Sequence, residues 1–339
     1  MRRPVSSMAS ILGIFMLGLT GAQAAVLLSI PKYPGATATY VRAINDKDVV
    51  TGYYTSDDGN THGFVGTLDG NYTSFDAPAN GTMPLGIDND GYITISTNYA
   101  SECPISGCAY IRAPDGTISE IHKGKHMLDS VVQGILDKDR FVGDYAVDGE
   151  APNVNPVFYG YLGKGDRYRS SITLPFTTTQ TRPRGMNKAG TIVGYYSEMG
   201  NGTFPGFVLQ DGVATSVSYP DDNAWQVYLE SINDRGMVAG SWVDFALTEE
   251  NAFLYDTAQN TFASIDVPHG HYVLANSINN KGVVAVSTER ASYIYCLKRS
   301  TCPVVAGGAI EVPTVWKPAS PENVRSVLCR DGCIRPERY

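Results

Sequence analysis

Two histidines separated by one glycine, His269 and His271, form the local arrangement best suited to chemistry in this sequence. Imidazoles at this spacing could face one divalent metal ion, and Asp221 or Asp222 could add a carboxylate from another segment. Three protein ligands would be needed, and the spacing supplies only two. The competing interpretation is a polar loop that contains histidines without a binding role. The sequence therefore predicts no cofactor and leaves a divalent metal as the alternative.

The remaining histidines lie in similar polar segments, close to acidic and aromatic residues. Paired carboxylates can act as acid and base in glycoside cleavage, and aromatic rings can stack on sugars. The acids are Asp57, Asp58, Asp148, Glu150, Asp221, Asp222, Glu249 and Glu250, and the rings are Tyr99, Phe204 and Trp225. The candidate ligand-binding residues are His62, His122, His126, Asp221, Asp222, Trp225, His269 and His271. Solvated loop acids without a catalytic role are the alternative.

No familiar catalytic motif accompanies these residues. The chain lacks a glycine-rich phosphate loop after a predicted strand, a Gly-x-Ser-x-Gly elbow and a cysteine–histidine pair in catalytic context. The run from Asp88 to Gly91 resembles a fragment of a calcium loop, but the flanking ligands and the bidentate glutamate are missing. The sequence therefore assigns no catalytic residue and leans against an enzyme without excluding one.

The six cysteines form three close pairs: Cys103 with Cys108, Cys296 with Cys302, and Cys329 with Cys333. Such spacing favours local disulfides, although it does not settle their connectivity. Short loops restrict the unfolded chain little, so each bridge is expected to contribute about 2 kcal/mol or less. Metal ligation by these cysteines is the alternative, and it is disfavoured because the pairs lie far apart in the chain.

A repeated unit must position all these residues. An apolar residue, then Asn or Asp, a short polar turn and an apolar run recur six times. The copies begin at Ile44, Ile87, Ile135, Met186, Ile232 and Ile278. Asn-Asp-x-Gly is hairpin chemistry, because glycine and asparagine adopt positive φ at low cost. Each copy continues with a short strand such as Gly63-Phe64-Val65 and with a strand that ends on proline, such as Ser264-Ile265-Asp266-Val267-Pro268.

One unit therefore predicts a four-stranded antiparallel sheet with two faces to cover. Stacking six copies around an axis covers both faces, so we expect an all-β fold, a six-bladed β-propeller. Leu27 to Pro31 resembles a closing strand without the rest of its blade, and we expect this N-terminal strand to pair with the last blade and close the ring. A straight β-solenoid is the alternative. The predicted blades are residues 36–79, 80–124, 125–176, 177–221, 222–269 and 270–313, followed by a C-terminal tail, 314–339.

Strand order decides which loops share an end of the propeller. The Asn-Asp-x-Gly turns and the hairpins between third and fourth strands lie at one end, here called the turn end. The links between second and third strands, and between blades, lie at the other, here called the loop face. All five histidines are predicted in or beside the loop face. Loops on a rigid scaffold commonly carry binding groups, so ligand binding is expected there.

The repeat resembles the HAF-type extracellular repeat family of bacterial proteins. The resemblance rests on the pattern Ile-Asn-Asp-x-Gly-x-Val-x-Gly-Tyr-Tyr, then His-Gly-Phe, then Phe-x-Ser-Phe-Asp-x-Pro, and it covers residues 40 to about 313. The match is best in blades one, four and five. Blade three departs with Leu136 in place of Asn, and blade six has Val286 where glycine is usual. The family implies export and a propeller-like repeat, and it implies no catalytic residues.

The first 24 residues have the pattern of a signal peptide. Arg2 and Arg3 precede an apolar run from Ile11 to Leu19, and Ala22-Gln23-Ala24 offers small residues for cleavage after Ala24. No later segment is apolar for long enough to span a membrane as a helix. Loss of residues 1–24 removes two arginines and no acids, so the net charge of −8 becomes −10. We expect a secreted or periplasmic monomer that does not bind nucleic acid, because an acidic surface repels phosphates.

Two function classes remain open at this stage. The first is an exported binding or scaffold module, with an unknown glycan or protein ligand engaged through the loop face that carries the histidines. The second is a carbohydrate-active hydrolase or lyase with its site at the propeller axis. Clustered acids or histidines beside aromatic rings at the axis would favour the enzyme, and a closed opening would favour the scaffold. Fold alone decides neither, since propellers host many activities.

Overall fold

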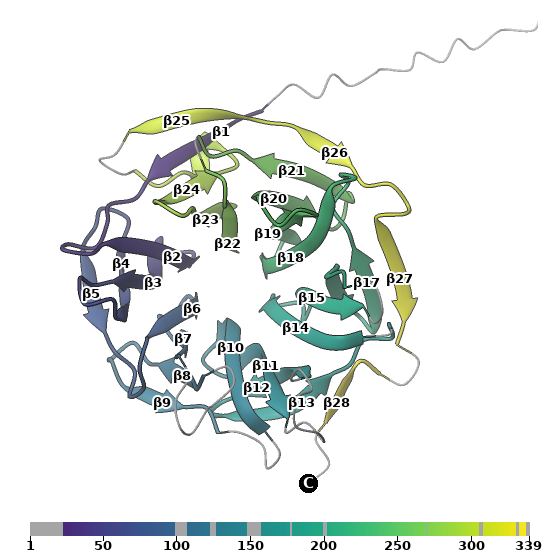
Figure 1. The fold of residues 1–339 in the computed structure, drawn as a ribbon, viewed down its shortest axis with the longest axis horizontal. Coiled ribbons are helices and arrows are strands. Elements are labelled where there is room, and N and C mark those ends of the chain that lie inside the picture. The colour runs from purple at the N-terminus through teal and green to yellow at the C-terminus, as the bar shows by residue number, and fades with distance from the viewer. Residues whose placement is uncertain are drawn as a thin grey trace, which may run out of the picture.

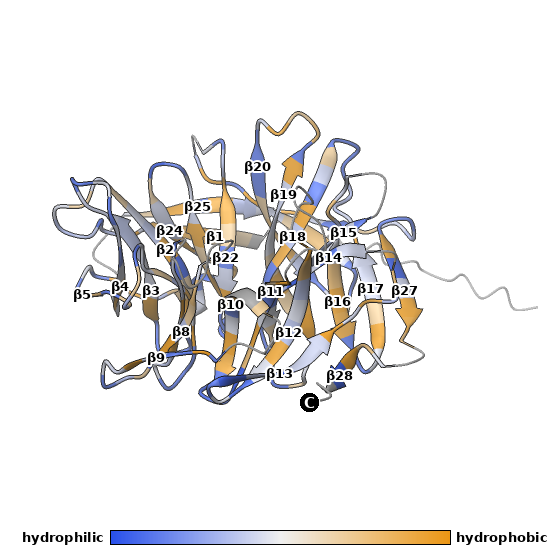
Figure 2. Ribbon diagram, turned by 60° about the horizontal axis from the view of Figure 1, so that its bottom comes forward, coloured by the Kyte–Doolittle hydropathy of each residue, from blue (hydrophilic) through white to orange (hydrophobic). Residues whose placement is uncertain are grey.

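Six antiparallel sheets surround a central axis in the computed structural model of the chain (Figure 1). The structure describes residues 23–98, 107–122, 127–147, 157–176, 178–198, 202–268, 270–304, 308–329 and 332–336. Each sheet is one blade, with its first strand innermost. The expected all-β, six-bladed propeller of four-stranded blades is confirmed. In Figure 2 apolar colours follow the strands, while hydrophilic colours dominate the connecting loops.

The first three blades follow one another in sequence. Blade one contains β2 (Ala38–Ile44), β3 (Val49–Thr55), β4 (Thr61–Thr67) and β5 (Tyr72–Phe75). Blade two contains β6 (Met83–Ile87), β7 (Ile93–Ser96), β8 (Ala109–Arg112) and β9 (Ile118–Glu120). Blade three contains β10 (Met127–Asp137), β11 (Arg140–Val147), β12 (Phe158–Lys164) and β13 (Arg167–Ile172).

The second half of the ring repeats this plan. Blade four contains β14 (Thr178–Met186), β15 (Ile192–Glu198), β16 (Gly206–Gln210) and β17 (Val213–Val217). Blade five contains β18 (Ala224–Ile232), β19 (Met237–Asp244), β20 (Glu250–Asp256) and β21 (Thr261–Ile265). Blade six contains β22 (Leu274–Ile278), β23 (Val283–Ser287) and β24 (Ser292–Cys296), and the short 3₁₀ helix η1 (Arg299–Thr301) follows it.

The fourth strand of blade six is β1 (Gln23–Ser29), which closes the ring as expected. It pairs with β24 through Val26 opposite Cys296 and with β25 (Ala309–Thr314) through Val26 opposite Glu311. The segment 310–313, which the sequence suggested as the closing strand of its own blade, is therefore a fifth strand outside β1. Two strands of similar pattern compete for this place, and only the closed ring decides which one lies inside.

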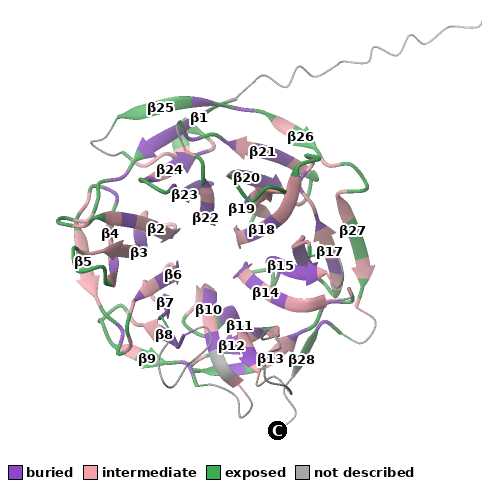
Figure 3. Cartoon of the chain, in the orientation of Figure 1, coloured by how far each residue is buried: buried purple, intermediate pink, exposed green. Residues whose placement is uncertain are grey.

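The hydrophobic core is divided into six clusters, and each lies between two neighbouring blades. β1 shows why. Ala25 and Leu27 face blade five, while Val26 and Leu28 face blade one, because successive side chains in a strand point to opposite faces. Burial is greatest in the middle of each blade and falls toward the rim (Figure 3). No blade has a core of its own, so the ring must close for any blade to be stable.

The C-terminal segment runs backward around the rim of the ring (Figure 1). After β25, β26 (Trp316–Pro318) pairs with β21, β27 (Val324–Leu328) with β17, and β28 (Ile334–Pro336) with β13. This tail adds a fifth strand to blades six, five, four and three. The sequence places these residues outside the repeat, and the structure shows that they cover the outer edges of the repeat.

Two predicted disulfides, Cys296–Cys302 and Cys329–Cys333, are present. Cys108 is also disulfide-bonded, and Cys103, its expected partner, lies outside the described residues. The first bridge links β24 to η1, and the second holds the turn between β27 and β28. Among the residues that the structure describes, no helix is long and apolar enough to cross a membrane.

Candidate functional site

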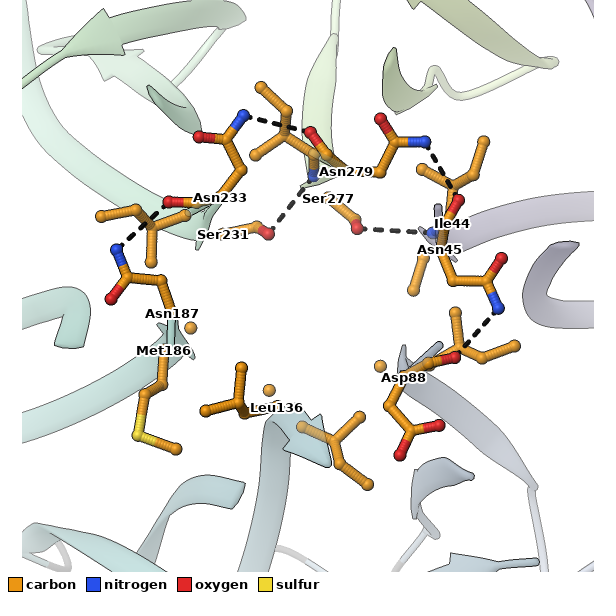
Figure 4. Close-up of a pocket in the computed structure, with 18 of the residues that line it drawn as sticks. Ile44, Asn45, Asp88, Leu136, Met186, Asn187, Ser231, Asn233, Ser277 and Asn279 are labelled. Atoms are coloured by element: carbon orange, nitrogen blue, oxygen red, sulfur yellow. Dashed lines mark hydrogen bonds between the residues drawn. The ribbon is translucent and has the colours of Figure 1, made fainter. Parts of the chain in front are cut away.

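The turn after each inner strand carries the asparagine of the repeat, and these side chains join the blades at the axis. In Asn279, Oδ1 accepts the backbone N–H groups of Lys281 and Val283, each at 3.0 Å. Its Nδ2 group donates to the carbonyl oxygen of Asn45 in blade one at 3.0 Å. Asn187, Asn233 and Asn45 donate in the same way to the next blade (Figure 4). One side chain thus shapes its own turn and links two blades.

A second layer of hydrogen bonds lies further out at the turn end. The Asp46 N–H donates to Oδ1 of Asn89 at 2.8 Å, and Asn89 Nδ2 donates to Oδ2 of Asp46 at 2.7 Å. Asn280 Nδ2 donates to the carboxylates of both Asp46 and Asp234. Among the described residues, this layer connects blades four, five, six, one and two. Turn chemistry therefore accounts for the runs that resembled calcium-loop fragments.

Both layers are interrupted at blade three. Asp88 occupies the asparagine position of blade two, where its Oδ1 accepts the N–H groups of Asp90 and Tyr92. Its other oxygen, Oδ2, is buried without a hydrogen-bond partner in the described structure. In the next blade Leu136 occupies the same position (Figure 4). A carboxylate cannot donate to the carbonyl of the following blade as the asparagines do, and burial raises the pKa of Asp88.

Every inner strand has a β-bulge just before its turn. The register skips one residue between Val41 and Ala43 in β2 and between Pro183 and Gly185 in β14, and the other four inner strands show the same shift. In each inner strand, the residue at this bulge is followed by a small residue, Ala, Gly or Ser. The six residues at the bulges, here called the bulge layer, are Arg42, Leu85, Gln133, Arg184, Glu230 and Asn276. Bulges re-aim side chains and often lie beside active sites.

The glycine of the Val-x-Gly-Tyr pattern lies opposite these bulges. A Cβ atom at Gly52 would approach the carbonyl oxygen of Tyr40 to 1.9 Å, and one at Gly194 would approach that of Arg182 to 2.2 Å. The second strand can therefore approach the bulged inner strand only where it has no side chain. The repeat thus conserves backbone shape at the axis, while the bulge-layer residues differ from blade to blade in size and charge.

A cavity of about 110 Å³ lies on the axis between the bulges and the turns. Its wall contains a small residue from each blade: Ala43, Gly86, Gly134, Gly185, Ser231 and Ser277. Leu85, Arg184, Glu230 and Asn276 of the bulge layer border the same space, and the exposed turn residues Lys188 and Asp234 lie at its outer end. Ser231 and Ser277 accept the N–H groups of Ile278 and Ile44, which leaves each hydroxyl hydrogen free to donate (Figure 4).

Two arginines give the bulge layer its charge. Arg42 Nη1 donates to Oδ1 of Asn276 at 2.7 Å. Arg184 Nη2 donates to the Tyr195 hydroxyl at 2.9 Å, and its Nε lies 3.8 Å from a Glu230 carboxylate oxygen. The Nε atoms of both arginines are buried and lack hydrogen-bond partners in the described structure. Arg184 remains charged, because nearby acidic groups outweigh its burial and raise its pKa.

Buried carboxyl groups flank this layer. Asp144 is fully buried, neither of its oxygens has a hydrogen-bond partner in the described structure, and Arg182 lies 3.9 Å away. Burial outweighs that arginine and raises the pKa of Asp144. Glu250 accepts a 2.5 Å hydrogen bond from the Ser241 hydroxyl, and burial raises its pKa, with Glu230 adding to the shift. Burial thus disfavours the charged form of both acids.

His62 lies between an aspartate and a serine, as the histidine of a catalytic triad does, but its hydrogen bonds do not suit catalysis. Its Nδ1 lies 2.9 Å from Oδ1 of Asp76, and its Nε2 lies 3.1 Å from the Ser56 hydroxyl oxygen. The Ser56 hydroxyl, however, donates to Asp58 at 2.5 Å, so its hydrogen points away from the histidine. Asp58 and Asp76 would also repel an oxyanion forming at Ser56. The hydrogen bond from the Ser56 hydroxyl lowers the pKa of Asp58 to about 2. The hydrogen bonds among these side chains are best explained as stabilising the loop between β3 and β4.

The other predicted residues are dispersed. Asp221, Asp222 and Trp225 lie at the loop face of blade five, where Trp225 packs edge-on against the exposed ring of Phe245. His271 follows in the link to blade six, and its carbonyl oxygen accepts the N–H of Glu250. Blade one, with His62, is not adjacent to blade five. His126 and His269 lie outside the described residues.

His122 lies in the link between blades two and three and contacts blade three. Its N–H donates to the Asp166 carbonyl oxygen in the hairpin between β12 and β13, at the end of the molecule that carries the asparagine turns. The outer strand β9 is only three residues long, so the chain after it reaches the neighbouring blade. Within the described ranges, no three His, Cys, Asp or Glu side chains gather closely enough to hold a metal ion.

Comparison with known proteins finds similar chains among solved structures. No family model and no curated protein matches the chain. Among solved structures, it is similar to the β-propeller domain of the Trilobed protease from Pyrococcus furiosus, at 12% identity and a TM-score of 0.45, covering 76% of this chain and 93% of that one. It is also similar to a streptogramin B lyase, at 12% identity and a TM-score of 0.41, covering 80% and 97%. At this distance the likeness concerns the propeller alone.

Proposed function

We propose that this chain is a binding module that takes a small polar ligand on the propeller axis, at the bulge layer. The observation that carries this proposal is the contrast between constant backbone and varied side chains at one repeat position. A repeat position with a purely structural role would carry similar residues in all six blades, as the next position does with its small residues. Here Arg42, Leu85, Gln133, Arg184, Glu230 and Asn276 surround one axis with different chemistry. The loop face with its histidines is the second surface for a larger glycan or protein ligand.

Export is part of the same proposal. The predicted signal peptide, the resemblance to the HAF-type repeat and the two described disulfides support a secreted or periplasmic location. Edman sequencing of the protein recovered from the medium or periplasm tests it, with Ala25 expected as the first residue. Recovery from the cytoplasm with an intact N-terminus would contradict export.

Ligand binding is tested by the melting temperature of residues 25–339 against neutral sugars, sugar acids, nucleosides, amino acids and divalent metals, with EDTA as a separate arm. A ligand that binds only the folded state raises the melting temperature. We expect a rise with one class of polar small molecule. The variant Leu85→Phe should abolish this rise by filling the cavity, and Leu328→Phe on the exposed tail is the matched control. An equal response from both variants would place binding away from the axis.

A carbohydrate-active hydrolase or lyase is the second candidate, and one observation favours it. Glu230 and Glu250 are neighbouring carboxyl groups, and burial raises the pKa of Glu250. The general acid in glycoside cleavage needs a raised pKa. Incubation with polysaccharides and detection of new reducing ends tests the idea. Glu250→Gln should abolish any activity, whereas His62→Asn should leave it unchanged, and an unchanged Glu250→Gln rate would rule out this pair.

A further inference from the structure

The loop face of blade five displays large apolar side chains to solvent. Phe245 is 68% exposed and Leu247 is 55% exposed, and both lie in the loop between β19 and β20. This loop stands out from the end of the ring with apolar colour at its tip (Figure 2). The ring of Trp225 packs edge-on against that of Phe245, with the ring centroids 4.8 Å apart. Exposed apolar side chains that gather in one place commonly mark an interaction site.

Backbone hydrogen bonds join this loop to the segments on both sides. The N–H of Phe245 donates to the carbonyl oxygen of Asn223, in the link from blade four, at 3.0 Å. On the other side, the N–H of Glu250 donates to the carbonyl oxygen of His271 at 3.0 Å, and the carbonyl oxygen of Glu250 accepts the N–H of Val273 at 2.8 Å. Three segments therefore form one surface, here called the blade-five platform: residues 221–226, 244–250 and 271–273.

The loop that carries Phe245 and Leu247 is fixed in one conformation by Asp244. The Oδ1 atom of Asp244 accepts the N–H groups of Thr248 and Glu249 at 2.7 and 2.8 Å, and its Oδ2 atom accepts the Thr248 hydroxyl at 2.9 Å. Leu247 has a φ angle of +57°, a left-handed conformation that strains a leucine and suits a glycine. A leucine here costs stability and also exposes apolar surface to water, so its presence points to a role for the side chain.

The blade-five platform carries several negative charges. Asp221, Asp222 and Glu249 are exposed on it. The hydrogen bond from the N–H of Glu249 lowers the pKa of Asp244, so this carboxylate also stays ionised at neutral pH. Four carboxylates thus lie on the segments that carry Phe245 and Leu247. Charges of one sign beside an apolar centre select a partner of the opposite sign.

Basic side chains are scarce near these carboxylates. Between Lys188 and Lys281 the sequence contains one basic residue, Arg235, and all three lie in the asparagine turns at the other end of the ring. The exposed Arg290, in the loop between β23 and β24 of blade six, lies 3.7 Å from a carboxylate oxygen of Glu289. Blades four and five therefore leave the negative charge of the platform unbalanced at this face, and it would attract a basic partner.

We infer that the blade-five platform docks a basic segment of a partner protein, with Phe245 and Leu247 contacting apolar side chains of that segment and the four carboxylates facing its lysines or arginines. A protein fits this surface better than a sugar, because apolar anchors with a charged rim are typical of protein interfaces and an aliphatic Leu247 offers no ring on which a sugar could stack. The inference rests on the part of the proposed function that gives the loop face a larger ligand.

Selection of random dodecapeptides displayed on phage tests this inference, with residues 25–339 as bait and the Leu247→Gly variant for counter-selection. We expect the selected peptides to carry net positive charge and at least one large apolar side chain, and their affinity in fluorescence anisotropy to fall as salt rises. A selection that yields no peptide preferring the wild type, or only acidic ones, would overturn the inference and leave the axial site standing. A chitosan hexamer that binds more tightly than every selected peptide would assign the platform to an amino sugar and overturn the protein partner.

The Leu247→Gly variant separates binding from folding. It relieves the left-handed strain, so it should raise the melting temperature by about 1–3 °C while weakening peptide binding by roughly tenfold or more. A loss of affinity together with a gain in stability cannot arise from misfolding. Leu328→Ser is the matched control, since Leu328 is an equally exposed leucine on the C-terminal tail, and it should leave peptide binding unchanged. Equal affinities of wild type and Leu247→Gly would contradict the inference.

A second pair of variants tests the charge of the platform. Asp222→Asn should weaken peptide binding severalfold at low salt and less at high salt, because it removes an exposed carboxylate beside the apolar side chains. Asp57→Asn removes an exposed loop acid in blade one and is the matched control. Equal effects of the two variants would mean that the net charge of the chain, and not the platform, attracts the peptide, which would overturn the assignment.

Discussion

The ring is held at its axis in two different ways. From blade four through five and six to one and two, buried asparagines connect successive blades by neutral hydrogen bonds, as Asn279 does to Asn45. Between blades three and four, Leu136 takes the asparagine position, and the buried Asp144 lies near the half-buried Arg182 and Arg184. Neutral amides thus join the blades on one side of the ring, while ionisable groups at other repeat positions lie between the blades on the other side.

The difference shows which contacts are structural and which are free for function. A buried amide satisfies its donors and acceptors within the protein, so it adds stability and offers nothing to a ligand. Both oxygens of Asp144 and the Nε atoms of Arg182 and Arg184 lack hydrogen-bond partners in the described structure, and buried groups of this kind contribute little to stability. The interrupted side of the ring therefore supplies the unsatisfied groups, while the asparagine side holds the scaffold together.

The largest expected effect is on the asparagine side. Asn279→Ala removes two bonds within its turn and one to blade one, and we expect unfolding free energy to fall by about 3 kcal/mol. Asn280→Ala, one residue further out and less buried, removes side-chain bonds to Asp46 and Asp234 and should cost about 1 kcal/mol. Urea unfolding of both variants measures the two losses of unfolding free energy. Equal losses would mean that burial at the axis adds nothing to these bonds.

Asp88→Asn should extend the asparagine layer toward blade three and stabilise the protein by about 1 kcal/mol at neutral pH. Burial raises the pKa of Asp88 above its ordinary value of 3.8, so the folded state retains a proton that the unfolded state loses. The contribution of protonated Asp88 to the stability of the wild-type protein is therefore complete below pH 3.8, and it is lost as pH rises through the raised pKa. Urea unfolding between pH 4 and 8 should show the advantage of Asp88→Asn growing with pH. A pH-independent difference would show that Asp88 titrates normally.

Asp144→Asn tests the opposite side of the ring. Because Asp144 favours its neutral form, replacement by a neutral amide should change stability at pH 7 by less than about 1 kcal/mol. Chemical unfolding at pH 7 measures this, with Asn279→Ala as the reference for a large loss. A loss above about 3 kcal/mol would show that an ionised Asp144 forms a necessary pair with the arginines.

The smallest effect is expected from the half-exposed salt bridge between Lys281 and Asp48, whose charged atoms lie 2.8 Å apart. Lys281→Ala should change stability by less than about 0.5 kcal/mol, because solvent screens exposed pairs. Unfolding in low and high salt measures it. A clear salt-dependent loss would mean that charges at the turn end contribute to ring closure alongside the buried amides.

Much of the fold was predictable from local pattern. Six copies of a short polar turn between short apolar strands predict six sheets, and the isolated strand from Leu27 predicts closure of the ring, which β1 performs. The departures at Leu136 and Val286 were also visible as breaks in the repeat. The pattern could not decide whether β1 or residues 310–313 would be the fourth strand of blade six, because both are short apolar strands that end on proline.

The sequence by itself determined the repeat, the turns and the strand order, because these depend on backbone preferences within one blade. The tertiary structure alone decided which residues share the axis. Leu85, Arg184 and Asn276 are far apart in the chain, and only the closed ring and a bulge in each inner strand bring them around one cavity. Their varied side chains within a uniform repeat were the signal available beforehand. The histidines attracted attention by residue type, yet His62 lies in blade one and His122 in the link between blades two and three, because the repeat distributes its loops around the ring.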